Sequence, residues 1–165
     1  MRADPDLMLQ LLDAHRGLMD RILTTYERDP SVREDMHQDL ALAVWRALPS
    51  FRGDASHRTF IARIAHNIGA DHVRRTIRGG NRESLDEDHP CGTLGPDQVA
   101  SEASLREALS RAIERLPLSQ RQVVSLHLED FSHAEIADAL GIGEGAVIVR
   151  LHRARQTLSA WMNRS

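Results

Sequence analysis

The residues most able to do chemistry in this chain are three arginines and a histidine near the C-terminus, Arg150, His152, Arg153 and Arg155. A guanidinium group binds phosphate and can make two parallel hydrogen bonds with guanine in the major groove of DNA. The cluster follows Gly141, at a place where a helix needs a left-handed residue to end. A short helix, a tight glycine turn and a basic helix in this order predict a helix-turn-helix module that reads duplex DNA. The alternative is a three-helix packing motif with a solvated arginine face.

The elements that would position this cluster have recognisable starts. Ser119 and Gln122 have the spacing of a capping box, in which each side chain satisfies a backbone N–H of the first turn, and Ser132 and Glu135 repeat that spacing. Glu144 would begin the basic helix, where the helix dipole favours a negative charge. Apolar residues at helical spacing predict the buried face of the basic helix: Val147, Leu151, Ala154 and Leu158.

The N-terminal half also has the spacing of helices, and no strand-type alternation stands out. Residues 6–28 form one amphipathic pattern. Ser31 and Glu34 have the capping-box spacing that starts a second helix, which Pro49 ends. After a glycine-containing loop, a third helix is expected from about residue 57 to 76.

Charge and composition divide the chain into two parts. The net charge is −3, and residues 83–104 hold six acidic residues and no arginine. Because this stretch is also rich in Gly, Pro and Ser, we expect a flexible acidic linker. We predict an all-α fold with a first domain at 1–80, the linker at 81–101 and a second domain at 102–165. The expected core of the second domain includes two leucines of its first helix: Leu105 and Leu109.

Other features bear on the class of protein. Cys91 is the single cysteine, so no intrachain disulfide can form and a reducing, intracellular setting is expected. No apolar run approaches membrane-spanning length, and no signal peptide is visible at the N-terminus. The nine histidines are scattered without the spacing of a metal site. We therefore expect no metal, no cofactor and no enzymatic activity.

Two long stretches of the chain resemble one protein family. Residues 33–75, REDMHQDLALAVWRALPSFRGDASHRTFIARIAHNIGADHVRR, resemble region two of bacterial sigma factors of the extracytoplasmic-function (ECF) group, in the sigma-70 family. Residues 116–158 resemble region four of the same family, including its RLHRAR segment. The resemblance implies a cytoplasmic protein that binds core RNA polymerase and directs it to promoter DNA. The first domain would read and help to melt the −10 element, and the second would read the −35 element. An anti-sigma factor is a further implied partner.

The resemblance assigns roles to matching positions. The implied polymerase-binding residues lie on the second helix: Asp35, Gln38 and Asp39. The implied −10 DNA-binding residues lie in the following loop and the third helix: Phe51, Arg52, Gly53, Asp54, Phe60, Asn67, Asp71, Arg74 and Arg75. The implied −35 DNA-binding residues lie on the basic helix: Ile148, Val149, Arg150, His152, Arg153 and Arg155. Trp45 is expected in the core. Phe60 could instead be a core residue, and the loop before it an ordinary connection.

The basic helix departs from the family pattern. Residues 146–149 read Ala-Val-Ile-Val where the family often has Thr-Val-Lys-Ser, so two phosphate-contacting positions become apolar. Ile148 and Val149 could touch thymine methyl groups or form a face buried on a protein partner. Arg150 and Arg155 could pair with acids of their own domain. Ala62 stands where the family usually has an aromatic residue, so melting would rely on other residues.

Two other functions remain open at this point. One is a helix-turn-helix regulator that binds an operator as a dimer, although the region-two-like half argues against it. The other is a sigma-like interaction module without productive promoter contact.

Overall fold

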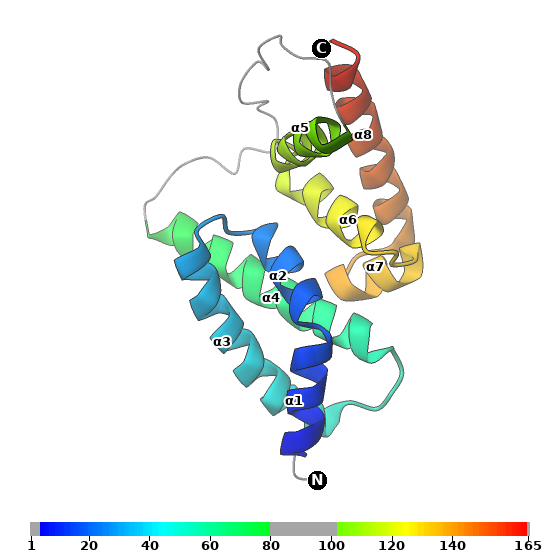
Figure 1. The fold of residues 1–165 in the computed structure, drawn as a ribbon. Coiled ribbons are helices and arrows are strands. Elements are labelled where there is room, and N and C mark those ends of the chain that lie inside the picture. Colours follow the sequence, from blue (N-terminus) through cyan, green and yellow to red (C-terminus); the bar gives the residue numbers. More distant parts are fainter. Residues whose placement is uncertain (1–3, 80–101, 165) are drawn as a thin grey trace.

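The computed structural model describes residues 4–79 and 102–164, and the elements in these two ranges are helices (Figure 1). The N-terminal range holds α1 (Pro5–Ala14), α2 (Arg16–Thr24), α3 (Pro30–Ala47), the short 3-10 helix η1 (Leu48–Ser50) and α4 (His57–Arg78). The C-terminal range holds α5 (Glu102–Glu114), α6 (Leu118–Leu128), α7 (His133–Leu140) and α8 (Glu144–Met162). The predicted all-α fold is confirmed for these residues. The predicted linker and Cys91 lie outside them.

The single helix predicted over residues 6–28 is wrong, because the chain breaks at His15. His15 has φ −112° and ψ 11°, outside the helical region, and it ends α1 and precedes α2. The break lets the two halves run in different directions. Helix α1 packs on α3, whereas α2 packs on α3 and also on α4 and α6. Periodicity alone could not find the break, since apolar spacing continues across it.

Two of the predicted helix starts are also wrong. Asp29, not Ser31, caps α3: its Oδ1 accepts a hydrogen bond from the Ser31 N–H at 2.8 Å, and Pro30 occupies the first helical position. Helix α6 begins before Ser119, directly after Pro117, with no side-chain cap. In both places a proline with its fixed φ sets the first turn earlier than the hydroxyl residue would.

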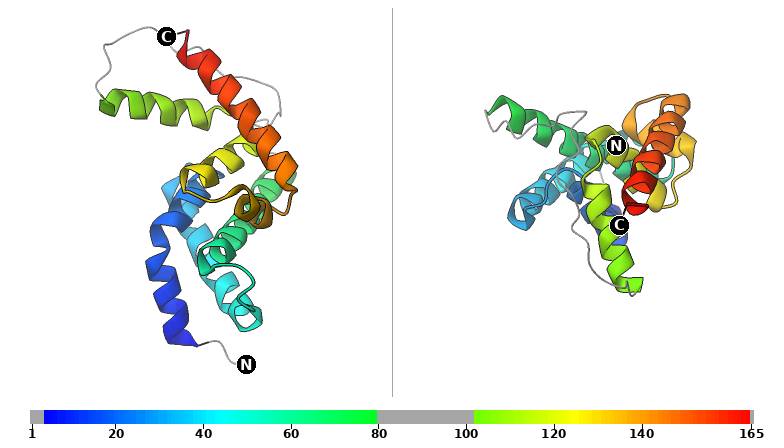
Figure 2. Two further views of the ribbon diagram at one scale, coloured as in Figure 1. Left: turned by 90° about the vertical axis from the view of Figure 1, so that its right-hand side faces the viewer. Right: turned by 90° about the horizontal axis from the view of Figure 1, so that it is seen from above.

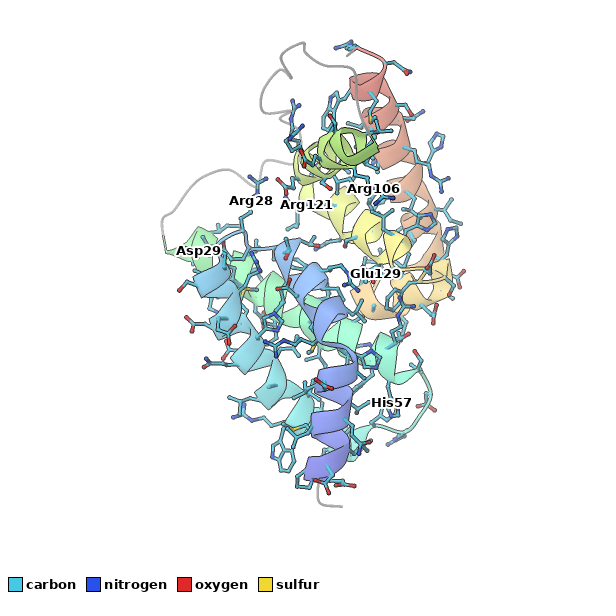
Figure 3. The ribbon with its side chains drawn as sticks, in the orientation of Figure 1. Arg28, Asp29, His57, Arg106, Arg121 and Glu129 are labelled. Atoms are coloured by element: carbon cyan, nitrogen blue, oxygen red, sulfur yellow. The ribbon has the colours of Figure 1, made fainter. Side chains whose placement is uncertain are left out.

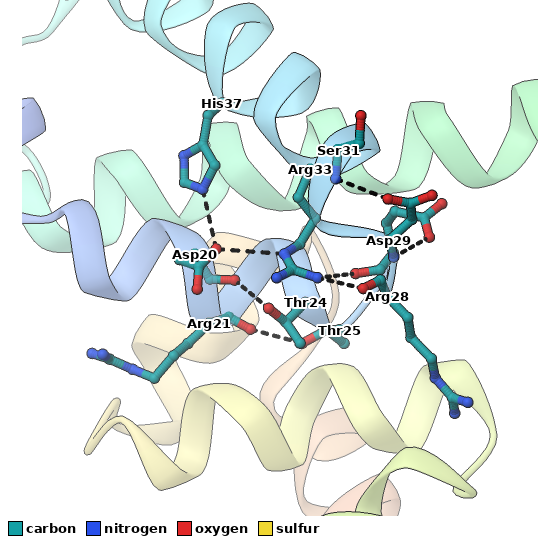
Figure 4. Close-up of polar contacts among 10 residues, drawn as sticks. Asp20, Arg21, Thr24, Thr25, Arg28, Asp29, Ser31, Arg33 and His37 are labelled. Carbon is teal, nitrogen blue, oxygen red and sulfur yellow. Dashed lines mark hydrogen bonds and ion pairs between the residues drawn. The ribbon is translucent and has the colours of Figure 1, made fainter.

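The turn between α2 and α3 is fixed by Arg33 (Figure 4). Its guanidinium donates to the carbonyl oxygen of Arg28 at 2.7 Å and lies 3.5 Å from the Asp20 carboxylate. Asp20 also lies 3.3 Å from the ring of His37 on α3. These contacts hold the start of α3 against α2, and so set the direction in which α3 presents its outer face.

The turn that follows α2 approaches α4 closely at Gly69. A Cβ atom at this position would overlap the ring of Tyr26, so glycine is required by space rather than by backbone conformation. The Tyr26 hydroxyl contacts the ring of His66, which lies on α4 one turn before Gly69. Burial lowers the pKa of His66 and raises the pKa of Tyr26. Burial thus favours the neutral form of both groups beneath α4.

The helix-turn-helix is formed by α7 and α8. Ser132 and Glu135 make the predicted capping box, with hydrogen bonds of 3.2 and 2.8 Å in the two directions. The backbone hydrogen bond from Ser132 lowers the pKa of Glu135. Gly141 ends α7 with a φ of 65°, the left-handed conformation predicted for it. The predicted buried face of α8 is confirmed, with Val147, Leu151 and Ala154 in the core and Leu158 partly buried against it.

The N-terminal and C-terminal helices pack against each other (Figures 1 and 2). Helix α7 lies along α4, and α6 contacts α2. The buried residues of the two ranges form one continuous hydrophobic cluster, from Leu11 to Ala154. Leu105 and Leu109 are not part of it: they are 49% and 36% exposed, so their predicted core placement is wrong. Helix α5 packs on α6 and α8 (Figure 2).

Candidate functional site

The loop between η1 and α4 forms one wall of a pocket of about 310 Å³. Phe51 and Phe60 meet there with ring centroids 4.8 Å apart and ring planes tilted by 50°. Gly53 turns the loop with a φ of 78°, which glycine adopts without strain. Further residues of the loop and α4 complete this part of the lining: Ser50, Arg52, Asp54, Ala55 and Arg63. Paired aromatic rings beside an arginine can stack a nucleobase and hold its phosphate.

Helix α4 fixes this geometry at its first turn. Ser56 caps the helix, because its hydroxyl accepts a hydrogen bond from the Thr59 N–H at 3.0 Å. Phe60 is half-buried, with its ring against Phe51 rather than sealed in the core. The structure thus brings together, at one end of α4, four of the residues that the resemblance assigns to −10 binding: Phe51, Arg52, Asp54 and Phe60. The sequence analysis missed Arg63, one turn further along.

An exposed face of α4 continues from this pocket. Residues three or four apart share a helix face, and this face carries Arg63, Asn67, Asp71 and Arg74. Arg74 donates a hydrogen bond to the Asp71 carboxylate at 2.7 Å, so these two charges partly offset each other. Arg75 is exposed beside them. The predicted −10 residues of this helix are therefore accessible and lie in line with the pocket.

A second exposed stripe runs along α3, and it is mixed rather than purely acidic. Asp35, Gln38 and Asp39 are all exposed, and Leu42 continues the stripe with 54% exposure. Trp45 is 38% exposed, so its predicted core placement is wrong. Only the opposite side of α3 faces the core, with Met36, Leu40 and Val44 fully covered. Exposed apolar side chains among acids suit a protein partner better than solvent alone.

A groove between α1 and α3 adjoins this stripe. Its volume is about 350 Å³, and Gln38 is the one predicted polymerase-binding residue that lines it. The groove is lined by apolar and charged side chains of α1, of α3 and of the first part of α2: Leu9, Leu12, Asp13, Arg16, Met19, Glu34, His37 and Ala41. Leu9, at 61% exposure, gives α1 an apolar contribution that the sequence analysis did not assign.

The outer face of α8 is basic with an apolar centre. His152, Arg153 and Arg155 are exposed, and Arg150 is half-buried. Among the residues that the structure describes, none of these three arginines forms an ion pair with an acid; Arg155 instead lies 3.4 Å from the His127 ring. The structure thus shows no pairing of Arg150 or Arg155 with an acid among the residues it describes. Ile148 and Val149 are 51% and 48% exposed on the same helix.

The interface between α4 and α7 carries charges from both sides. Arg63 forms an ion pair with Asp138 of α7, which also lines the aromatic pocket. Arg58 lies over the Phe131 ring at 4.2 Å from its centroid, and its guanidinium donates a hydrogen bond to the carbonyl oxygen of Glu129. The Glu129 carboxylate, labelled in Figure 3, also accepts two hydrogen bonds from Arg21 of α2. No pattern in the sequence pairs these residues, since they lie 71 to 108 positions apart.

None of the helices that the structure describes is long and apolar enough to cross a membrane. Within residues 4–79 and 102–164, no group of three or more His, Cys, Asp and Glu side chains has a metal-binding arrangement.

The chain matches two family profiles. Residues 11–78 match the one described as Sigma-70 region 2, and residues 106–158 match the one described as Sigma-70, region 4. The chain is 32% identical over 151 residues to the ECF RNA polymerase sigma factor SigM of Mycobacterium tuberculosis, a match covering 91% of this chain and 74% of that protein. It is 31% identical over 136 residues to the ECF RNA polymerase sigma-E factor of Escherichia coli, covering 75% and 70%.

Two solved structures share the fold. CnrH in complex with the cytosolic domain of CnrY superposes with a TM-score of 0.69 at 24% identity, covering 98% of this chain and 91% of that chain. The sigma factor RpoE in complex with the anti-sigma factor NepR from Bartonella quintana has a TM-score of 0.68 at 20% identity, covering 96% and 95%. These likenesses show the arrangement of the helices.

Proposed function

The chain belongs to the ECF group of the sigma-70 family, and on that premise we propose how its surfaces divide the steps of transcription initiation. As a sigma factor, it binds core RNA polymerase and directs the enzyme to promoters. We propose that residues 1–80 and 102–165 are its two functional domains, that residues 81–101 link them, and that it acts in the bacterial cytoplasm.

The −10 element is captured as single-stranded DNA by the aromatic pocket and the exposed face of α4. The observation that carries this proposal is the Phe51–Phe60 pair, which forms a pocket at the end of a helix face bearing arginines. A base flipped out of the duplex needs a shaped cavity and an aromatic surface for stacking. Arg63 and Arg74 would then follow the phosphate backbone along α4.

Asp138 of α7 lines the same pocket and should oppose the entry of DNA. Asp138 pairs with Arg63 there, and its carboxylate would meet the phosphate of an entering nucleotide as a like charge. The arginine that should hold DNA is thus already neutralised by the second domain. The proposal therefore includes opening of the α4–α7 interface when the chain joins core polymerase.

A direct test replaces Phe51 with alanine in the holoenzyme. Loss of one stacking surface, worth about 1–3 kcal/mol per base, should weaken binding to a −10 single strand by roughly 5- to 150-fold. Met162→Ala serves as the control, because Met162 is an exposed apolar residue at the far end of α8. Core-polymerase affinity should be unchanged in both variants. Equal −10 affinity for Phe51→Ala and the wild type would contradict the proposed pocket.

Core polymerase is bound by the exposed stripe of α3. Asp35, Gln38 and Asp39 supply polar contacts, and Leu42 with Trp45 supplies apolar area. Replacing Asp35 and Gln38 together with alanine should weaken core-polymerase binding in fluorescence anisotropy. The matched control is Glu107→Ala, an acid on the surface of α5. If the double variant keeps wild-type affinity, this face is not the polymerase contact.

The −35 element is read as duplex DNA by α8. The exposed Arg153 lies where a recognition helix meets base edges or the adjacent backbone. Arg153→Ala should weaken binding of the holoenzyme to promoter duplex and spare its assembly. Unchanged promoter affinity would remove Arg153 from this role.

An anti-sigma factor is the remaining proposed partner, and the two similar structures are of sigma factors bound to CnrY and NepR. The exposed leucines and tryptophan of α1 and α3 provide a surface for it. Such a partner should compete with core polymerase for the α3 stripe. A purified partner that binds without displacing polymerase would contradict a shared site.

A further inference from the structure

The recognition helix presents an apolar residue at the centre of its outer face. In a helix of about 3.6 residues per turn, Val149 lies two positions from the buried Val147 and thus almost opposite it. Val149 is 48% exposed, and Ile148 beside it is 51% exposed. Both precede the arginine-rich segment and lie in the first half of α8, the part of a recognition helix that contacts base edges.

The charges around this pair favour nucleic acid over an apolar protein surface. Val149 is followed one turn later by His152 and Arg153, which are both exposed. Arg150 and Arg153 form no ion pair with an acid in the described part of the chain. Glu144, at the first position, is the single acidic residue of α8. An apolar side chain surrounded by cationic side chains is complementary to the major groove of DNA, which is bordered by phosphate groups.

The major groove offers one apolar group that such a side chain can contact. Thymine carries its C5 methyl there, whereas cytosine, adenine and guanine present hydrogen-bonding atoms. Valine cannot donate or accept a hydrogen bond, so it can favour thymine but cannot favour the other bases. Its single preferred rotamer in a helix also means that little side-chain entropy is lost on contact.

We propose that Val149 reads the C5 methyl of a thymine in the −35 element, with Ile148 packing against the neighbouring wall of the groove. The inference rests on the proposed −35 role of α8 and adds the base that this chain selects. Direct readout at this position then depends on hydrophobic contact, where the family often uses a polar side chain.

The first experiment is a selection with the intact holoenzyme. Core polymerase with wild-type chain, Val149→Ser or Val149→Ile is used to enrich promoter duplexes randomised over the upstream element. The wild type should enrich thymine at one position, the serine variant should lose that preference, and the isoleucine variant should keep it. Because Val149 is half exposed, the serine variant should fold normally, which its thermal unfolding checks.

The second experiment removes the methyl group alone. Deoxyuridine replaces the selected thymine in a fixed duplex. A lost methyl contact of about 0.8 kcal/mol corresponds to roughly four-fold weaker binding, at about 1.36 kcal/mol per ten-fold. Wild type should show this loss, and Val149→Ser should not distinguish thymine from deoxyuridine. Deoxyuridine in the spacer serves as the control and should leave both affinities unchanged.

The outcomes separate the possibilities. Equal wild-type affinity for thymine and deoxyuridine would overturn the inference, as would an equal loss in the serine variant. An unchanged selection for Val149→Ser would also overturn it and would leave the apolar pair to a protein partner. If the wild-type holoenzyme forms but enriches no upstream element, the −35 role itself fails and the inference fails with it.

Discussion

Replacing Arg58 with alanine should separate the N-terminal and C-terminal helices. Arg58 lies in the first turn of α4, where its guanidinium covers the Phe131 ring and donates to the carbonyl oxygen of Glu129. A cation–π contact contributes about 0.5–2 kcal/mol, and a hydrogen bond from a charged donor contributes about 1.5–3 kcal/mol. The Arg58 side chain is 38% exposed, so we add nothing for its 4.0 Å ion pair with the Glu129 carboxylate.

The expected loss is about 2–5 kcal/mol, which corresponds to a fall of roughly 30- to 5,000-fold in the ratio of closed to open molecules. Single-molecule energy transfer between dyes at positions 46 and 159, introduced as Arg46→Cys and Ser159→Cys in a Cys91→Ser background, measures this ratio. A salt titration brings both states into the measurable range, since salt weakens the surrounding ion pairs.

The matched control is Arg111→Ala. Arg111 pairs with Glu107 within α5, at 3.9 Å, and does not bridge the two ranges of helices. The control should keep the wild-type ratio, while circular dichroism should show unchanged helix content in both variants. If Arg58→Ala and Arg111→Ala give the same ratio, Arg58 does not hold the interface and the reasoning above is refuted.

Three further predictions concern stability. Gly69→Ala should lower the free energy of unfolding by about 1–3 kcal/mol in urea denaturation, because the added methyl overlaps the Tyr26 ring; an unchanged midpoint would mean that α2 and α4 separate freely there. Ser132→Ala should cost about 1 kcal/mol by the same assay, since the cap of α7 is lost, whereas a loss below a few tenths would contradict the capping role. Burial lowers the pKa of His66 below 6.5, so stability is full above that pH and falls as the pH drops, because the unfolded chain takes the proton first. His66→Gln should therefore flatten the decrease in melting temperature between about pH 7.5 and 5, and an equal decrease in both proteins would show that His66 is not responsible.

Local chemistry explains which parts of the fold could be predicted. The helix-turn-helix was predictable because its signals are local: Ser132 and Glu135 cap each other across three residues, and Gly141 ends the same helix. No second capping residue nearby offered a different start or end. The predicted start at Ser119 failed because Pro117 supplied an earlier one. Both Pro117 and Ser119 can begin a helix, and they lie close together in the sequence. The error came from choosing the serine over the proline.

For the binding surfaces, only the family resemblance and the helix spacing supported predictions from the sequence. Spacing places Asp35, Gln38 and Asp39 on one face of α3, and the structure exposes all three. It does not say whether Trp45 faces the core or solvent, because its position borders both sides of the helix. The side of α3 that is buried is set by the helices that pack on it, and one of them, α1, takes its direction from the break at His15, which periodicity does not predict.

No local sequence pattern predicts the interface between the two ranges of helices. This interface nevertheless determines which arginines are available to bind DNA. Arg58 and Arg63 lie on α4, where a sequence analysis would count them as free cations available to DNA. In the folded chain, Arg58 is held by Glu129 and Phe131, and Arg63 by Asp138. By contrast, the arginines of α8 form no ion pair with an acid among the described residues, and they remain exposed or half-exposed. If the proposed assignment is correct, the second domain covers charge at the proposed −10 surface while leaving its own proposed −35 surface uncovered. The proposed opening should then change the DNA affinity of the first domain more than that of the second.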